Sequence, residues 1–176
     1  MSEKEREGLV IVYTGNGKGK TTAALGLMLR AWGQDMKVIM LQFIKHSRAN
    51  FGEHRAAKRI GLEIVPVGTG FIIREEDREN GILAALELWE VARAKISSGE
   101  YRMVVLDEFS YPLHFGWVAV DEALQVFRDR PAGMHVVITG RDVPQDIIDF
   151  ADLVTEMREL KHPYRQGVKA QPGVEF

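Results

Sequence analysis

The sequence contains no cysteine, and this absence removes several kinds of chemistry at once. Disulfide bonds, thiolate metal sites and cysteine nucleophiles are all excluded. The chain also lacks a long apolar run, since none approaches the ~20 residues that a membrane-spanning helix needs. Residues 1–8 carry mixed charge without an apolar stretch, which is not the pattern of a signal peptide. We therefore expect a cytoplasmic protein with no membrane partner.

The sequence also has no large excess of positive or negative charge. Lys and Arg number 23, Asp and Glu number 25, and the formal net charge is −2. A near-neutral chain has no electrostatic reason to take nucleic acid as its main partner, and we expect none. The five histidines do not show metal-ligand spacing: His46 and His54 lie in polar sequence, and His135 begins an apolar run. A metal site built from histidines is not expected.

Apolar residues make up 45% of the 176 residues, which suits one globular domain. We expect residues 1–7 to form a mobile arm and residues 8–176 to form a single domain. Strand-like runs are predicted at 9–13, 37–43, 62–67, 103–108, 135–140 and 153–160. Helical patterns are predicted at 23–32, 74–97, 120–127 and 144–151, and residues 46–59 form a polar stretch. This alternation predicts an α/β fold with a mostly parallel sheet and helices on both faces.

One glycine-rich turn joins the first predicted strand to the first helix: Thr14-Gly15-Asn16-Gly17-Lys18-Gly19-Lys20-Thr21-Thr22. Such a turn directs backbone N–H groups toward an anion, and the helix N-terminus adds partial positive charge. Lys20 would then supply a mobile cation for the phosphate oxygens, and the Thr21 hydroxyl can ligate Mg²⁺. A plain turn with a surface lysine is the alternative, but the strand and helix context favours a phosphate-binding P-loop. Thr14 stands where the common pattern has glycine.

Polar residues follow other predicted strands at 42–45, 107–108 and 139–141. In parallel sheets ligands bind at the carboxyl ends of the strands, so these residues should converge on the turn. Asp107 and Glu108 resemble the second nucleotide motif, whose strand-end carboxylate holds Mg²⁺. Arg141 either reaches a phosphate or pairs with Asp142 at the surface, and Arg30 either reaches the ligand or points to solvent.

Six strings together resemble a known family, the ATP:corrinoid adenosyltransferases of the cobalamin pathway. They are Gly-Asn-Gly-Lys-Gly-Lys-Thr-Thr (15–22), Gln-Phe-Ile-Lys (42–45), Gly-Thr-Gly-Phe (68–71), Val-Val-Leu-Asp-Glu (104–108), Thr-Gly-Arg (139–141) and Lys-His-Pro-Tyr…Gly-Val-Lys-Ala-Gln-Pro-Gly-Val-Glu-Phe (161–176). The resemblance covers residues 8–176. It implies a RecA-like P-loop fold and a reaction in which Co(I) of a reduced corrinoid attacks the 5′-carbon of ATP. Triphosphate leaves, which is unusual for such a loop and fits its altered first position.

The resemblance also implies roles for individual residues. It implies catalytic roles for Lys20, Glu108 and Phe71, and it would place Phe71 against the corrin ring. The triphosphate and nucleotide would contact Gly15, Asn16, Gly17, Lys18, Gly19, Lys20, Thr21, Thr22, Arg30 and Arg141. The Mg²⁺ ligands would come from Thr21, Asp107 and Glu108. Ile73 stands where the family often has tryptophan. A homodimer and a flavin- or flavodoxin-type electron donor are expected as partners.

Two other functions are compatible with parts of the pattern. A motor-like or regulatory ATPase of the same fold class would use Glu108 to position a hydrolytic water. A non-catalytic corrinoid carrier would bind corrinoid without needing ATP. The products of ATP turnover separate these alternatives, because transfer yields triphosphate whereas hydrolysis yields ADP and phosphate.

Overall fold

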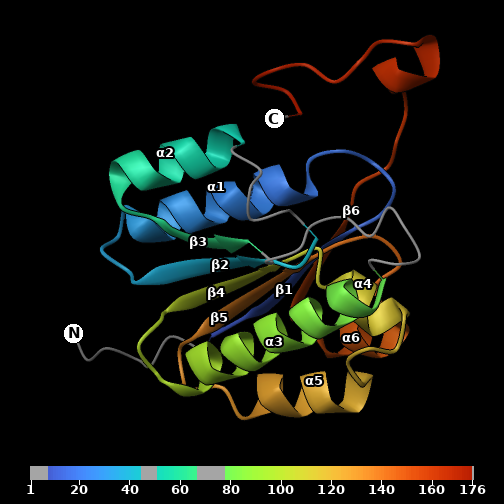
Figure 1. Ribbon diagram of the computed structural model, residues 1–176. Helices are drawn as coiled ribbons and strands as arrows, with labels where there is room; N and C mark the ends of the chain where they lie inside the picture. Colours follow the sequence, from blue (N-terminus) through green and yellow to red (C-terminus); the bar gives the residue numbers. More distant parts are fainter. Residues whose placement is uncertain (1–7, 45–50, 67–77, 176) are drawn as a thin grey trace.

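The structure is a computed structural model that describes residues 8–44, 51–66 and 78–175. Within these ranges it contains an α/β layered fold, with a central sheet between two groups of helices (Figure 1). The predicted arm at 1–7 lies outside the described residues. So do Lys45, Phe71 and Ile73, which belong to the strings that carry the resemblance or lie beside them.

Six parallel strands form the sheet in the described residues, in the order β3-β2-β4-β5-β1-β6. Their bounds are β1 (Val10–Thr14), β2 (Val38–Gln42), β3 (Glu63–Pro66), β4 (Met103–Asp107), β5 (His135–Thr139) and β6 (Leu153–Glu156). The expected parallel sheet is confirmed, and every pairing between neighbouring strands is parallel. β2 and β4 are buried along their full length, because helices cover both faces of a parallel sheet.

Helices cover the two faces unequally. Figure 1 shows α1 (Lys20–Trp32) and α2 (Gly52–Ile60) on one face. The other face carries α3 (Arg78–Ser97), α4 (Ser110–His114), α5 (Val120–Arg128) and α6 (Gln145–Phe150). Met28 of α1 packs with Val105 in the smaller core. The larger core holds Trp89 of α3, whose ring stacks on Phe109 with centroids 4.9 Å apart. Both cores fix the strand ends that carry the polar residues.

Two helices were not predicted from the sequence. α2 falls in the stretch predicted to be only polar, and Ala57 is its one buried residue, so the helix has few apolar residues to reveal it. α4 has only five residues, too few to produce a periodic signal. The last strand is also shorter than predicted, since β6 ends at Glu156 and its four residues are exposed.

The C-terminal segment leaves β6, forms the 3-10 helix η2 (Pro163–Gln166), and turns back toward the end of the sheet where α1 begins (Figure 1). His162 precedes η2, and its Nδ1 accepts a hydrogen bond from the Tyr164 backbone at 3.1 Å. The segment therefore has local structure of its own. Among the described residues, no helix combines the length and apolar character needed to cross a membrane.

Candidate active site

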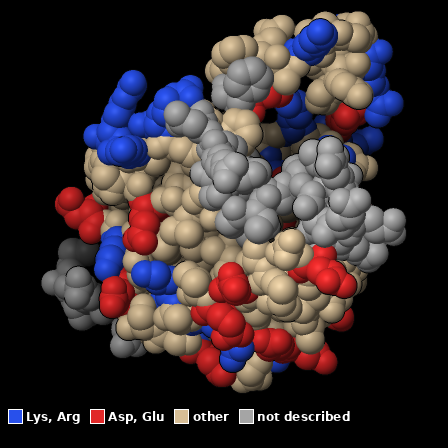
Figure 2. Space-filling view, viewed as in Figure 1, with Lys and Arg blue, Asp and Glu red and all other residues tan. Residues whose placement is uncertain are grey.

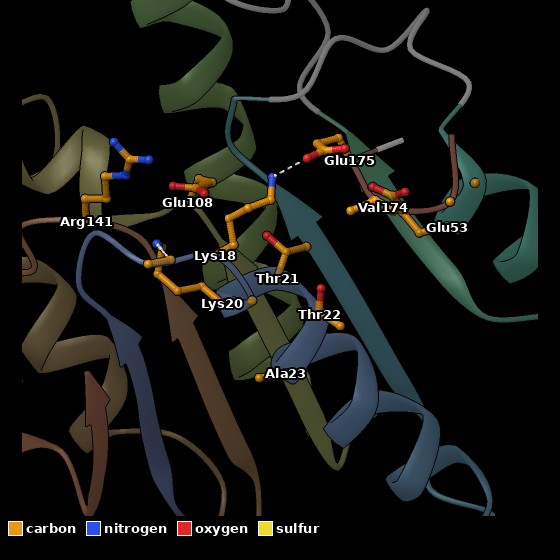
Figure 3. A pocket seen from close by; sticks show the side chains of 14 residues that line it. Lys18, Lys20, Thr21, Thr22, Ala23, Glu53, Glu108, Arg141, Val174 and Glu175 are labelled. Carbon is orange, nitrogen blue, oxygen red and sulfur yellow. Dashed lines mark hydrogen bonds and ion pairs between the residues drawn. The ribbon is translucent and has the colours of Figure 1, made fainter. Parts of the chain in front are cut away.

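A cavity of about 990 Å³ opens at the carboxyl ends of the strands, at the upper end of the range for small-molecule sites. Its lining comes from the glycine-rich turn, the first turn of α1, the start of α2, the ends of β4 and β5, and the C-terminal segment (Figure 3). The lining residues are Gly17, Lys18, Gly19, Lys20, Thr21, Thr22, Ala23, Gly52, Glu53, Glu108, Arg141, Gly173, Val174 and Glu175. This confluence is where a parallel sheet is expected to bind its ligand.

The shape of the glycine-rich turn follows from its neighbour, the chain that continues from β6. The Gly17 N–H donates to the Met157 carbonyl at 2.7 Å, and a Cβ on Gly17 would lie 2.8 Å from the backbone of Met157 and Arg158. Gly19 caps α1 with a φ of +112°, which a side chain would disfavour. Thr14 is buried at the end of β1, paired with Glu156, so the position without glycine belongs to the strand.

Lys20 is the buried cation of this turn. Its Nζ donates to the carbonyls of Gly15 at 2.7 Å and Gly17 at 2.9 Å. Burial lowers the pKa of Lys20, the negative charge of Glu108 raises it, and Arg141 lowers it further. The side chain therefore lies folded against the turn, within electrostatic range of the carboxylate and the guanidinium that face the same pocket.

The two carboxylates after β4 have different surroundings. Asp107 is fully buried, where Oδ1 accepts from Thr139 Oγ1 at 2.7 Å and Oδ2 accepts from Gln42 Nε2 at 3.0 Å. Glu108 lines the cavity with a φ of +59°, and its N–H donates to Thr139 Oγ1 at 2.9 Å. The Oε1 atom of Gln42 in turn lies 2.6 Å from Nε2 of His54 on α2. Asp107 therefore supports the strand ends, whereas Glu108 faces the pocket.

The residues present suit a magnesium ion that arrives with phosphate. In the described ranges, no group of three or more His, Asp or Glu side chains could enclose a metal. Thr21 and Glu108 nevertheless line the same cavity and offer a hydroxyl and a carboxylate oxygen. Mg²⁺ prefers oxygen ligands and is usually held by one or two carboxylates together with substrate phosphates and water. The donor set fits that mode of binding.

Most of the predicted nucleotide residues meet at this pocket, but some do not line it. Lys18, Thr22 and Arg141 line it, whereas Gly15 and Asn16 belong to the turn without facing the cavity. Arg30 is exposed in the last turn of α1, and its charge acts on Tyr13, where it opposes the rise in pKa that burial causes. The pocket gives no support to the predicted contact of Arg30 with nucleotide. Phe71, which was predicted to lie against the corrin ring, is outside the described residues.

Two parts of the pocket lining were not predicted from the sequence. Gly52 and Glu53 enter at the start of α2, a helix that was not predicted from the sequence. Gly173, Val174 and Glu175 enter from the C-terminal segment. The string at 161–176 was part of the resemblance, so a signal for the second part was present, although its place at the pocket was not predicted.

Charge is distributed unevenly around this site despite the near-neutral total. Figure 2 shows blue Lys and Arg side chains gathered over α2 and the C-terminal segment, and red Asp and Glu side chains gathered around α3 and α5. Basic surface near the pocket raises the local concentration of anionic ligands. The asymmetry favours approach of a phosphate-bearing molecule from the end of the sheet where the cavity opens.

Comparisons with known proteins agree with this geometry. The family model "ATP:corrinoid adenosyltransferase BtuR/CobO/CobP" matches residues 6–176. A corrinoid adenosyltransferase of Escherichia coli (strain K12) is 39% identical over 173 residues, covering 98% of this chain and 88% of that protein. One from Pseudomonas aeruginosa is 40% identical over 175 residues, covering 98% and 86%.

A solved structure shares the fold at much lower identity. It is the flagellar accessory protein FlaH from Methanocaldococcus jannaschii, with a TM-score of 0.61 and 14% identity, covering 85% of this chain and 71% of that one. This likeness bears on the fold alone and agrees with the expected P-loop α/β class. The family match spans nearly the whole sequence, including the turn, both strand-end motifs and the C-terminal segment. The chain therefore belongs to the ATP:corrinoid adenosyltransferase family.

Proposed function

We propose that the pocket holds ATP by its triphosphate and presents the 5′-carbon to the Co(I) centre of a reduced corrinoid, in the adenosyltransferase reaction of the cobalamin pathway. One observation carries the proposal. Lys20, Thr21, Glu108 and Arg141 line a single cavity at the N-terminus of α1. Cations, backbone N–H groups and a helix dipole then all face the position of a bound polyphosphate.

The reaction makes unusual demands on such a pocket. Co(I) would supply the electron pair of the new cobalt–carbon bond. The bond from C5′ to oxygen would break, and triphosphate would leave with the electron pair of that broken bond. Negative charge therefore grows on the triphosphate as the reaction proceeds. Lys20 and the N–H groups of the turn would stabilise this charge, since fixed donors that face a developing charge lower the barrier. No attacking water needs to be positioned at the γ-phosphate.

Magnesium is the cofactor that we propose for this leaving group, where it would neutralise phosphate charge. Thr21 and Glu108 would hold it, while Asp107 would position Glu108 through Thr139. Glu108→Gln should then raise the Mg²⁺ concentration needed for half-maximal activity. Asp107→Asn is the comparison, because it should mainly lower stability. Equal Mg²⁺ requirements in Glu108→Gln and wild type would contradict the assignment.

The function is tested by mixing the protein with ATP, Mg²⁺ and chemically reduced cobalamin. Absorbance should report a light-sensitive alkyl corrinoid, with one triphosphate released for each corrinoid alkylated. ADP and phosphate without an alkyl corrinoid would instead support the ATPase alternative. Corrinoid binding that survives Lys20→Ala and does not depend on ATP would support the carrier alternative.

Two partners complete the proposal. We propose a homodimer, and the support is the exposed edge strand β6, where Leu153 and Val154 present apolar side chains. Light scattering would measure the mass, and Leu153→Asp should shift it toward the monomer. A flavin- or flavodoxin-type electron donor would keep cobalt in the Co(I) state. Replacing the chemical reductant with such a donor tests that part separately.

A further inference from the structure

The C-terminal segment ends as a wall of the active-site pocket, where it forms a closed turn. The backbone N–H groups of Val174 and Glu175 both donate to the Gln171 carbonyl, at 3.2 and 3.0 Å. Gly173 lies within this turn with a φ of +79°, a conformation suited to glycine. The turn places Gly173, Val174 and Glu175 against the cavity, opposite the residues that begin α1.

The side chain of Glu175 joins this turn to the glycine-rich turn. Its Oε1 lies 3.1 Å from Nζ of Lys18, and its Oε2 accepts a hydrogen bond from the Gln171 backbone at 2.8 Å. Figure 3 shows the Lys18 ammonium directed toward Glu175 across the mouth of the pocket. The Gln171 hydrogen bond, and then Lys18, lower the pKa of the Glu175 carboxyl, so it is ionised at neutral pH. An anion thus already contacts one lysine of the phosphate-binding turn.

Lys18 and Lys20 consequently differ in their availability to a polyphosphate. Lys20 is buried and bound to carbonyls of its own turn, whereas Lys18 is half-exposed and contacts a carboxylate. A phosphate oxygen that approaches Lys18 must share the ammonium with Glu175 or displace its carboxylate. Two anions on one ammonium repel each other, and each weakens the other's hold.

We propose that Glu175 is a displaceable anion of the triphosphate subsite, which competes with triphosphate for Lys18 and so speeds release of the leaving group. This inference rests on the proposed function. The leaving triphosphate is the most highly charged form of the ligand, and a site made only of cations would retain it. A carboxylate that returns to Lys18 lowers the affinity for free triphosphate while leaving Lys20 and the backbone donors in place.

The test measures binding of inorganic triphosphate with Mg²⁺ to the full chain by titration calorimetry. Glu175→Gln should tighten binding about two- to fivefold, the effect expected from loss of an exposed ion pair. The substituted amide keeps an acceptor for the Gln171 N–H, so the turn should persist, and a thermal unfolding scan checks this. In turnover with ATP and reduced cobalamin, added triphosphate should inhibit Glu175→Gln more strongly by the same factor.

Two controls separate competition at Lys18 from a general effect of charge. Glu100→Gln removes the same charge from another exposed carboxylate–lysine pair, that of Glu100 with Lys37 away from the pocket, and it should leave triphosphate affinity unchanged. In a Lys18→Ala background, Glu175→Gln should have no further effect, because the shared ammonium is gone. Tightening by Glu100→Gln, or tightening that persists without Lys18, would overturn the inference.

Failure of this inference differs from failure of the proposed function. If the wild-type chain binds triphosphate, Lys20→Ala weakens that binding, and Glu175→Gln leaves it unchanged or weaker, only the competition by Glu175 is rejected. If the wild-type chain does not bind triphosphate at all, both are rejected. The salt dependence gives an added check, since the gain in Glu175→Gln should shrink as ionic strength rises.

Discussion

Thr139 and Asp107 end two neighbouring strands and are joined by a hydrogen bond of 2.7 Å between Oγ1 and Oδ1. The same Oγ1 accepts the backbone N–H of Glu108 at 2.9 Å. One hydroxyl therefore satisfies a buried carboxylate and fixes the backbone of the residue that faces the pocket. Glu108 has a φ of +59°, and this local conformation depends on a support of that kind.

Thr139→Val should remove both of these hydrogen bonds while keeping the shape of the side chain. Asp107 would lose a hydrogen-bond donor inside the protein, and we expect a loss of about 1–3 kcal/mol in the free energy of unfolding. The rate of adenosyl transfer should fall as well, because Glu108 loses its anchor. Urea unfolding and the cobalamin assay measure the two effects. Thr155→Val on exposed β6 is the control, expected within about 0.5 kcal/mol of wild type.

Removing Lys20 should cost far more activity than removing Lys18. We expect Lys20→Ala to lower kcat by about 10²–10³-fold, as loss of a donor to a developing anion does. Lys18→Ala should cost about fivefold or less, since its ammonium is half-exposed and shared with Glu175. Steady-state kinetics with ATP and reduced cobalamin decide the order. A larger loss in Lys18→Ala would overturn the assignment of Lys20 as the main phosphate lysine.

Gly17 and Gly26 should respond oppositely to alanine. A Cβ on Gly17 would lie 2.8 Å from the backbone of Met157 and Arg158, so Gly17→Ala must displace the glycine-rich turn, with lower stability and weaker ATP binding. Gly26 lies inside α1, and a Cβ there would meet nothing within 4 Å beyond its own helix backbone. Gly26→Ala should therefore stabilise the protein by about 0.5–1 kcal/mol. Urea midpoints measure both, and equal midpoints would contradict the close approach at Gly17.

Mild acid should destabilise the protein through His135. Burial, followed by the charges of Arg102 and Arg130, lowers the pKa of His135 below its ordinary value of 6.5, and its Nδ1 accepts the Leu9 N–H at 3.1 Å. Below pH 6.5 the unfolded chain binds a proton that the folded chain resists until its own, lower pKa is reached. The stability that neutral His135 allows is therefore fully present above pH 6.5. It is lost as the pH falls from 6.5 toward the lower pKa of His135 in the folded chain.

The measurement is the urea midpoint at about pH 7.5 and about pH 5.5, on either side of the ordinary histidine pKa. The fall between these values should be smaller in His135→Gln than in wild type, because the residue responsible no longer titrates. His114→Gln, on the exposed surface of α4, serves as the matched variant and should retain the wild-type fall. A similar fall in His135→Gln and wild type would show that other groups control the acid response.

The sequence predicts the parts of the site that carry a strong local signal. The apolar runs of β1 and β4 and the glycine-rich turn required no knowledge of the tertiary fold, because apolar continuity, glycine spacing and the abrupt acidic end of β4 are local. The distinct roles of Asp107 and Glu108 depend on the neighbours of β4, namely Gln42 on β2 and Thr139 on β5. That strand order is a non-local property, which periodicity does not encode.

The pocket residues from α2 and the C-terminal segment were harder to predict than those from the glycine-rich turn and the strand ends. α2 buries a single residue, Ala57, and is polar overall, so a prediction that looks for apolar runs does not find it. The C-terminal turn is polar, and it is built around Gly173 and a carboxylate that bonds to its own backbone. Its position depends on the long-range pair of Lys18 with Glu175, which a reading of local sequence does not reveal.

The place of β1 in the sheet has a consequence for synthesis. Within the described sheet, the strand that leads into the phosphate-binding turn pairs with β5 and β6, which begin at His135 and Leu153. At about 5–20 residues per second, a ribosome needs roughly 6–25 seconds between β1 and the first of these partners. During that interval β1 can pack against α1, which follows it directly, but both of its hydrogen-bonding edges lack their native strand partners. Unpaired strand edges are open to aggregation, and here only late sequence closes them.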